Sequence, residues 1–230
     1  RHLAVSFEHY WCWLPKKLRN FLGNKASKLD QRNPFLRRLS KVFSGAELEG
    51  DEKLINYFRW MRRSDLLPLF SVEWRKHLEE QEPSFPMIDF LNGLPNTVLP
   101  LERMLALEQR FFLTDHNLIY TDKMSMAEGV EARVPFLDLD LVEYAQSIPT
   151  RLKQKGKEGK WILKKAMEPY LPKDVIYRPK SGFGAPLRQW MRHELRDLLG
   201  CFLGEESLRN RGIFDPGAVS RMIQANESGR

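Results

Sequence analysis

The stretch from residue 120 to residue 138 interleaves charged side chains with apolar ones, which is costly near a hydrophobic core unless the charges are paired. Its charges include Asp122, Lys123, Glu131, Arg133 and Asp138. The carboxylates can orient a substrate or accept a proton, or the charges can form a structural salt-bridge network. On an extended segment Glu131 and Arg133 point the same way, and Asp138 can cap the next helix. Asp122 and Lys123 fit a structural pair better than a catalytic one.

A second chemically suggestive stretch, residues 177–186, places Arg178 and Lys180 on a loop punctuated by glycine and proline, just before a predicted helix. Backbone amides, a helix N-terminus and a lysine together suit an anion. The alternative is an ordinary surface loop with two basic residues. Phosphate binding and the surface loop are both compatible with these residues taken alone.

Taken together, three motifs in this order resemble the asparagine synthetase (glutamine-hydrolysing) family, in the C-terminal part of its ATP-pyrophosphatase synthetase domain. The family patterns are Asp-(Lys/Arg)-x-x-Met-Ala, Glu-x-Arg-x-Pro-Phe-Leu-Asp and Arg-x-Lys-x-Gly-Phe. Here they read Asp122-Lys123-Met124-Ser125-Met126-Ala127, Glu131-Ala132-Arg133-Val134-Pro135-Phe136-Leu137-Asp138 and Arg178-Pro179-Lys180-Ser181-Gly182-Phe183. The similarity is specific over residues 101–195 and only loose over residues 1–100.

This resemblance implies an ATP-dependent carbon–nitrogen ligase in the full-length parent protein. A substrate carboxylate, that of aspartate in the parent activity, attacks the α-phosphorus of ATP, so that an acyl-adenylate forms and pyrophosphate leaves. Ammonia from a glutaminase domain then attacks the acyl carbon and gives asparagine and AMP. ATP and Mg²⁺ are the implied co-substrates of the parent, and neither is expected to be bound by this chain alone.

The resemblance also implies roles for individual residues. Lys180 is the expected catalytic residue, because a compact ammonium suits the charge that develops on departing pyrophosphate. Support for the phosphate loop is expected from Arg178, Ser181 and Gly182. Binding of substrate, or support of the residues that bind it, is expected from Glu131, Arg133 and Asp138. No complete cofactor site is expected, and because the five histidines include no His-x-x-x-His pair, no metal site is expected either.

The departures from the family pattern are as informative as the match. The pyrophosphate loop of the family, Ser-Gly-Gly-x-Asp-Ser after a strand, has no counterpart in this sequence, and the N-terminal cysteine of a glutaminase domain is absent as well. We therefore expect a fragment that is inactive alone. It would be the helical part of an α/β adenine-nucleotide-alpha-hydrolase-like (HUP) synthetase domain whose parallel sheet is largely missing. The apolar face that would rest on this sheet should be exposed and favour a homodimer.

The elements that position these residues are predicted to be helices, so the class within the chain is mainly α. Apolar residues at spacings of three and four predict one helix over residues 101–112 and another over residues 115–128, which Gly129 ends. Ser71 is the expected N-cap of a further helix, and Pro186 the expected first residue of a helix that reaches residue 203. No paired strands with a hairpin turn are predicted.

Proline spacing predicts how the chain is divided. Four prolines and a glycine between residues 82 and 100 predict an irregular connector: Pro83, Pro86, Gly93, Pro95 and Pro100. A variable helical part, residues 1–81, is then expected before it. The helical C-terminal part that carries the family motifs, residues 101–230, is expected after it.

Two further alternatives stay open, the first implied by the family resemblance and the second by the charge of the chain. The same scaffold serves related synthetases and amidotransferases with other acceptors, namely β-lactam-forming, peptide-cyclising and polysaccharide-associated ones. The net charge of +7 and the basic run over residues 25–41 suit a helical module for nucleic acid or membrane surfaces, but the sequence has no recognised nucleic-acid motif, and neither partner is expected. Cys12 and Cys201 imply no disulfide framework, so a cytoplasmic location is expected.

Overall fold

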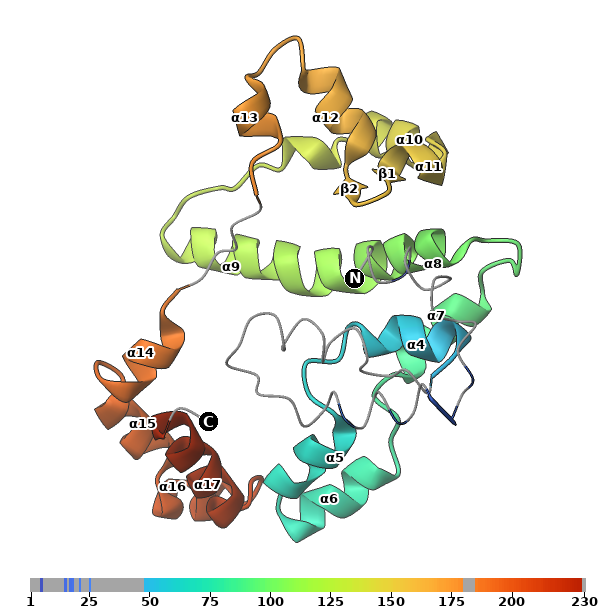
Figure 1. Cartoon of the computed structure of the whole chain (residues 1–230). Coiled ribbons are helices and arrows are strands. Elements are labelled where there is room, and N and C mark those ends of the chain that lie inside the picture. Colours follow the sequence, from blue (N-terminus) through green and yellow to red (C-terminus); the bar gives the residue numbers. More distant parts are fainter. Residues whose placement is uncertain are drawn as a thin grey trace. The chain divides into compact units, whose positions relative to one another are not determined.

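The computed structural model describes residues 48–179 and 185–228, together with six isolated positions nearer the N-terminus (Val5, Pro15, Lys17, Leu18, Phe21 and Lys25). Contacts between Cα atoms divide the chain into two compact units, each of which is considered by itself. Unit 1 comprises residues 1–57 and 86–179, and unit 2 comprises residues 58–85 and 180–230. The described part is mainly helical, as the sequence predicts (Figure 1). The three-part division of the chain by its prolines stays a prediction.

Unit 1 holds most of the helices and the one short hairpin that the described residues form. Its elements are α4 (Gly50–Asn56), α7 (Phe85–Asn92), α8 (Pro100–Leu107), η3 (Glu108–Leu118), α9 (Ile119–Ala127), η4 (Pro135–Leu137), α10 (Leu139–Ser147), α11 (Thr150–Lys153), β1 (Gln154–Lys155), β2 (Glu158–Gly159), α12 (Trp161–Met167) and α13 (Lys173–Ile176). The first residue of α7 belongs to unit 2 by contacts.

One long helical rod runs through α8, η3 and α9, from Pro100 to Ala127 (Figure 1). The sequence predicted a break between residues 112 and 115, but the chain stays helical there. The π-helix η3 spans this position and joins α8 to α9. No glycine or proline lies between Leu101 and Glu128, so nothing in the sequence ends the helix there. The rod ends at Gly129, whose φ of 69° suits a glycine after the last turn.

The core of unit 1 forms where α4 and α7 meet the start of the rod. Met104 and Leu107, three residues apart on α8, are both completely buried, and so is Leu91 of α7. Helix α4 contributes Leu54 and Ile55, which are 3% and 2% exposed. The connector predicted over residues 82–100 is therefore not irregular throughout, since it contains α7. Pro86 is the second residue of α7. The first backbone N–H groups of a helix have no partner within the helix, so the N–H that proline lacks is not missed there.

A short hairpin corrects the expectation that the chain contains no paired strands. The two-residue strands β1 and β2 pair antiparallel, with Gln154 opposite Gly159 and Lys155 opposite Glu158. Gly156 opens the two-residue turn with a φ of 57°, a conformation that glycine adopts without strain. The turn leads the chain directly into α12.

A lysine with a left-handed backbone stands between this hairpin and α12, at Lys160 (φ 57°, ψ 34°). A Cβ disfavours this region, so Lys160→Gly relieves backbone strain in the folded chain but also increases the conformational entropy of the unfolded chain. We expect the net effect to raise the free energy of unfolding by about 0.5–1 kcal/mol. Lys160→Ala removes the same ammonium but keeps the Cβ, so it should change stability by less than about 0.5 kcal/mol. Urea denaturation of both variants provides the comparison. A glycine variant no more stable than the alanine variant would contradict strain at this position.

Unit 2 is built from seven short helical elements within its described residues. They are α5 (Arg63–Leu66), η2 (Leu67–Leu69), α6 (Val72–Glu79), α14 (Leu187–Arg192), α15 (Arg196–Leu203), α16 (Glu205–Arg211) and α17 (Pro216–Glu227). The two sequence segments of the unit meet at a β-bridge between Phe70 and Phe214, whose ring centroids lie 5.1 Å apart. Leu208 of α16, which is 1% exposed, lies in the core of this unit.

One helix boundary and one helix cap in unit 2 differ from prediction. The helix expected from Pro186 to residue 203 is divided into α14 and α15, and Arg192 at the end of α14 donates from Nε to the Asn226 carbonyl on α17 at 2.9 Å. Ser71 stands at the N-cap position of α6, but its hydroxyl donates to the Gly212 carbonyl at 2.8 Å instead of capping its own helix.

Candidate active site

The acidic and basic residues of the second family motif form a surface ion pair. The Arg133 guanidinium forms an ion pair with Glu131, in which Nη2 donates to Oε2 at 3.0 Å and Nε lies 2.9 Å from Oε1. The two residues lie on the extended segment between α9 and η4, so side chains two apart point the same way, as the sequence predicted. The Arg133 and Glu131 side chains are 83% and 68% exposed, which rules out the buried form of the network. Both groups therefore face open space in unit 1.

Asp138 closes this motif and begins α10. Its Oδ1 accepts a hydrogen bond from the Leu141 backbone amide at 3.1 Å, which is the N-cap contact expected from the sequence. Before it, Val134 has a non-helical backbone (φ −120°, ψ 80°), since a following proline disfavours the helical region. Local rules thus shape the whole segment from Glu131 to Asp138.

The first motif lies on α9, and its two charges do not pair with each other among the described ion pairs. Asp122 and Lys123 are adjacent on a helix, so their side chains diverge by about 100°, and both are exposed. The structural pair expected from the sequence is therefore not formed. The Asp122 backbone carbonyl instead accepts a hydrogen bond from the Ser125 hydroxyl at 3.1 Å.

Large apolar side chains are exposed at the end of the second motif and along α10, which follows it. The clearest examples are Phe136 at 69%, Leu139 at 77% and Tyr144 at 65%. Such a face suits further burial against protein. The homodimer expected through it stays a prediction.

Phe136 also links the second motif to a hollow in unit 1. The hollow measures about 400 Å³ and lies between α8, α10 and α12, with Leu105, Ile148 and Ile162 among its apolar walls. No carboxylate lines it, while Lys153 and Lys160 do. It can therefore hold apolar groups beside two lysine side chains.

Tyr177 follows α13 and directly precedes the third motif, at the end of unit 1. The Tyr177 hydroxyl donates to Glu168 Oε1 at 2.6 Å, and Lys165 Nζ donates to the same oxygen at 2.7 Å. The bond from Lys165 lowers the pKa of the Glu168 carboxyl, and the bond to Glu168 raises the pKa of the Tyr177 hydroxyl. Arg178 beyond it is exposed.

The remaining predicted residues of the phosphate loop, Lys180, Ser181 and Gly182, lie outside the described residues. The catalytic role expected for Lys180 therefore stays a prediction. The structure brings Glu131 and Arg133 together and places Asp138 at the other end of their segment, one short helical turn away in the chain.

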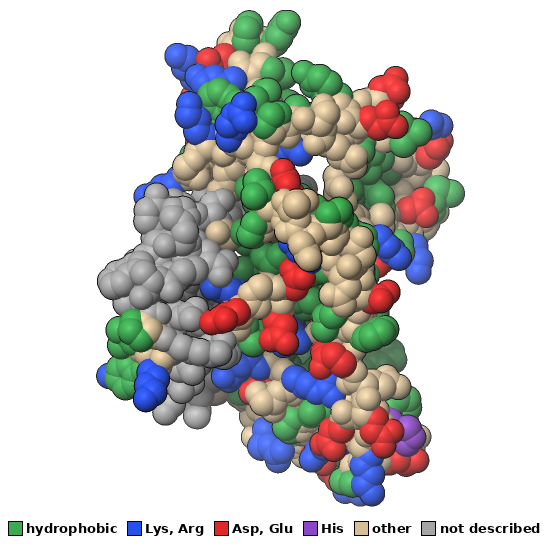
Figure 2. Space-filling view, turned by 90° about the vertical axis from the view of Figure 1, so that its right-hand side faces the viewer, with side chains coloured by type: hydrophobic (Ala, Val, Ile, Leu, Met, Phe, Trp, Pro, Cys, Tyr) green, Lys and Arg blue, Asp and Glu red, His purple; other side chains and the backbone are tan. Residues whose placement is uncertain are grey.

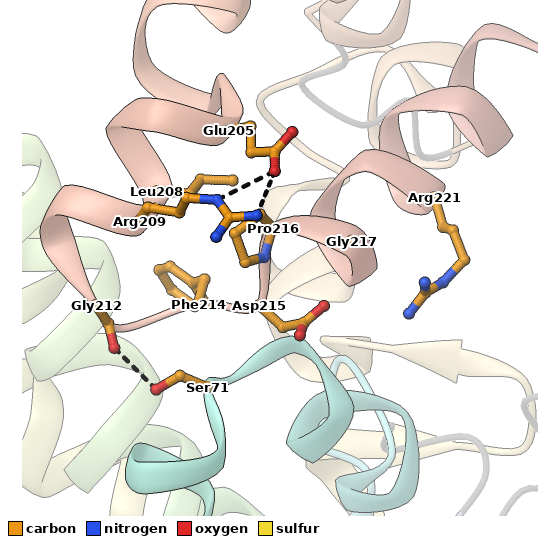
Figure 3. A pocket seen from close by; sticks show the side chains of 10 residues that line it. All are labelled: Ser71, Glu205, Leu208, Arg209, Gly212, Phe214, Asp215, Pro216, Gly217 and Arg221. Atoms are coloured by element: carbon orange, nitrogen blue, oxygen red, sulfur yellow. Dashed lines mark hydrogen bonds and ion pairs between the residues drawn. The ribbon is translucent and has the colours of Figure 1, made fainter.

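A second hollow, of about 770 Å³, lies within unit 2 and contains none of the predicted site residues (Figure 3). Its two carboxylates already serve the fold: Glu205 pairs with Arg209 at 2.6 Å, and Asp215 accepts from the Ala218 amide at 2.6 Å as the cap of α17. Sequence reasoning missed this cap, although aspartate directly before proline is a helix-start signal that points to it.

Charge is mixed over the face shown in Figure 2, where Lys and Arg side chains alternate with Asp, Glu and hydrophobic ones. Among the described residues, no group of three or more His, Cys, Asp or Glu side chains has the arrangement of a metal site. None of the described helices has the length and apolar character needed to span a bilayer.

Comparison with known proteins addresses the family directly. The sequence profile of the family described as asparagine synthase matches residues 5–230. A putative glutamine-hydrolyzing asparagine synthetase of Mycobacterium tuberculosis is 28% identical over 221 residues, which cover 94% of this chain and 32% of the relative. Asparagine synthetase 1 of Bacillus subtilis is 42% identical over 80 residues, 35% of this chain and 13% of the relative.

A third relative, asparagine synthetase 3 of Bacillus subtilis, is 36% identical over 138 residues, which cover 55% of this chain and 22% of the relative. No solved structure matches the chain significantly. The matched region covers 32% of the length of each mycobacterial relative, so the chain spans about a third of these proteins. Because the family profile covers nearly the whole sequence, and the motifs that prompted the resemblance lie inside it, the chain belongs to the asparagine synthase family.

Proposed function

We propose that this chain is the helical C-terminal portion of a synthetase domain that makes asparagine from aspartate, ATP and ammonia released from glutamine. The observation that carries the proposal is the family match over residues 5–230, which contains the three motifs in family order. The names of the relatives, glutamine-hydrolyzing asparagine synthetases, support the same reaction. The domain would be of the HUP type, with its parallel sheet supplied by residues other than these 230.

The proposed reaction has two chemical steps. An aspartate carboxylate oxygen attacks the α-phosphorus of ATP, the bond to the β-phosphate oxygen breaks, and pyrophosphate leaves with that electron pair. Ammonia then attacks the acyl carbon, AMP leaves, and the nitrogen loses a proton to give the amide. Two anions must meet in the first step, so fixed cations at the departing pyrophosphate are the largest contribution that this chain can make. In the proposal Lys180 supplies one of them, and Arg178, Ser181 and Gly182 support the same loop.

Mg²⁺ would accompany ATP in this reaction. Its ligands would be phosphate oxygens and groups outside this chain, because Mg²⁺ commonly binds through one or two carboxylates together with substrate phosphates. Aspartate and ammonia complete the set of proposed partners, with the ammonia supplied by a glutaminase domain.

The Glu131–Arg133 pair has a proposed role in presenting the acceptor. Both carboxylate oxygens of Glu131 lie close to Arg133 nitrogens, at 2.9 Å and 3.0 Å, so the pair is nearly neutral as a unit. The guanidinium keeps further N–H donors that can meet a substrate carboxylate. Asp138 anchors the other end of the segment through its helix cap. The pair therefore either orients the acceptor directly or holds the segment that does so.

Isotope transfer tests the proposed reaction. The enzyme to test is the complete synthetase, meaning a polypeptide that joins these residues to the Ser-Gly-Gly-x-Asp-Ser loop and a glutaminase domain. With ¹⁸O-labelled aspartate carboxylate, adenylation should place one ¹⁸O atom in each AMP formed, because the attacking oxygen stays on phosphorus when ammonia displaces AMP. Mass spectrometry of AMP measures this transfer.

The outcomes of this experiment separate the proposal from its competitors. Unlabelled AMP formed together with asparagine would exclude the acyl-adenylate route. If aspartate stimulates no AMP formation at all, asparagine synthesis is the wrong activity. A screen of other carboxylates by pyrophosphate release would then identify the acceptor, including β-lactam and peptide precursors.

A further inference from the structure

The hollow of about 400 Å³ in unit 1 combines an apolar wall with a cationic edge. Leu105 of α8, Ile148 just after α10 and Ile162 of α12 form part of the wall, and all three are half-buried. The volume lies within the range of small-molecule sites, which is about 300–1,000 Å³. The described residues of unit 1 therefore leave room for an apolar group of the size of a small ligand.

The charged groups among the residues that line this hollow are all cationic. They are Lys153, at the end of α11, and Lys160, which precedes α12. Lys153 Nζ donates to the Gln146 carbonyl at 3.1 Å, so its ammonium is held in place. Lys160 is exposed, and no contact of its ammonium with the described residues is found. One fixed cation and one available cation thus stand beside the apolar wall.

The hairpin places Lys160 at the hollow and keeps that side open. Strand β1 packs against α11 and α12, and the left-handed backbone of Lys160 joins β2 directly to α12 (Figure 1). Gly159, which also lines the hollow, has no side chain, and a Cβ there would meet no heavy atom within 4 Å. The hollow is therefore not filled from the side of the hairpin.

We propose that this hollow binds an amphiphilic anion, of the chemical class of the medium-chain carboxylates. The apolar chain lies against the wall, and the carboxylate meets the ammonium groups of Lys153 and Lys160. Charge complementarity sets the class of ligand, because a cation at the same place would meet two like charges and no carboxylate. The site uses none of the residues assigned to the proposed reaction, so the two proposals can be tested separately.

Calorimetric titration of the 230-residue chain with three ligands of equal chain length tests the charge preference. Decanoate should bind about fivefold or more tightly than decan-1-ol, since one exposed ion pair contributes up to about fivefold. Decylammonium should bind more weakly than the alcohol. From hexanoate to decanoate the affinity should rise about two- to fourfold per methylene, because each methylene moves from water to the apolar wall.

Reversal of one charge locates the head of the ligand. Lys160→Glu should weaken decanoate at least about fivefold and strengthen decylammonium, since it replaces the available cation by an anion. Lys157→Glu is the matched control, because Lys157 is exposed on the same hairpin but does not line the hollow. At an ionic strength of about 0.15 M, screening over about 8 Å should keep the effect of this control within about twofold.

Two bulky substitutions locate the apolar chain. Gly159→Leu fills open space without strain, because Gly159 does not have a left-handed backbone. Ala145→Phe adds a ring from α10, where Ala145 is exposed and lines the hollow. Each should weaken decanoate about 10-fold, whereas Gln146→Phe, on an exposed neighbour that does not line the hollow, should leave it unchanged. Thermal unfolding shows that the variants are folded, and Ala145→Phe decides the outcome if Gly159→Leu is not.

Three results would overturn the proposal. Decanoate that binds no more tightly than decan-1-ol would remove the anionic head from the site. Equal losses in Lys160→Glu and Lys157→Glu would show a general effect of the net charge. If decanoate does not bind, and sedimentation shows a dimer that Ala145→Phe dissociates, the hollow belongs to an interface with a second copy of the chain.

Discussion

Replacing Lys180 with alanine is expected to lower aspartate-dependent ATP–pyrophosphate exchange by about 100-fold or more in the complete synthetase, while glutamine hydrolysis continues. The reason is electrostatic: negative charge moves onto the pyrophosphate as it leaves, and a fixed ammonium favours that state more than the bound substrates. Removal of one such preorganised group typically costs about 100- to 1,000-fold in rate. Glutamine hydrolysis takes place in another domain, so it should not respond.

The measurement is incorporation of labelled pyrophosphate into ATP, with glutamine hydrolysis followed in the same preparation. Lys157→Ala is the matched control, because Lys157 is an exposed lysine in the hairpin turn of unit 1 and makes no described contact. Lys180→Arg should recover only part of the rate, since a planar guanidinium cannot replace a compact ammonium at the same place. Exchange within about threefold of the unaltered enzyme in Lys180→Ala would remove Lys180 from the mechanism.

Replacing Arg103 with methionine is expected to destabilise the chain by about 2–4 kcal/mol, because it leaves a partly buried carboxylate without its partner. Arg103 of α8 donates from Nε to Asp51 Oδ1 of α4 at 2.8 Å and from Nη2 to the Leu91 carbonyl of α7 at 2.8 Å. Its side chain is only 12% exposed. The hydrogen bonds to Asp51 raise the pKa of the guanidinium, so it stays charged at every accessible pH. One side chain therefore joins three helices around the core of unit 1.

Equilibrium unfolding in urea provides the measurement, with the slope of the transition checked for constancy. Arg62→Met is the matched control: it breaks the Arg62–Asp65 ion pair of unit 2, whose side chains are 62% and 46% exposed, and should cost less than about 1 kcal/mol. The double variant Arg103→Met with Asp51→Asn should recover part of the loss, because it no longer buries an unpaired charge. A cost for Arg103→Met as small as that of the control would show that the pair contributes no more than a surface contact.

Several features of the site follow from local spacing, and the sequence determined them. Glu131 and Arg133 pair because residues two apart on an extended segment point the same way, and Val134 is non-helical because a proline follows it. Asp138 caps α10 because a carboxylate at that position can reach an amide three residues on. The helical class and the family motifs were equally readable, since both depend on residue type and order alone.

Other features depend on groups distant in the chain, and only the tertiary structure decided them. Asp51 and Arg103 are 52 residues apart, and Ser71 and Gly212 are 141 apart, so nothing in their own neighbourhoods identifies the partner. The tertiary structure also buries Leu91 of α7, a helix that forms within the proline-rich connector. It likewise brings the Tyr177 hydroxyl to Glu168. The physical reason is that local contacts need only backbone geometry, whereas distant ones form only after folding has closed the intervening loop and paid its entropy.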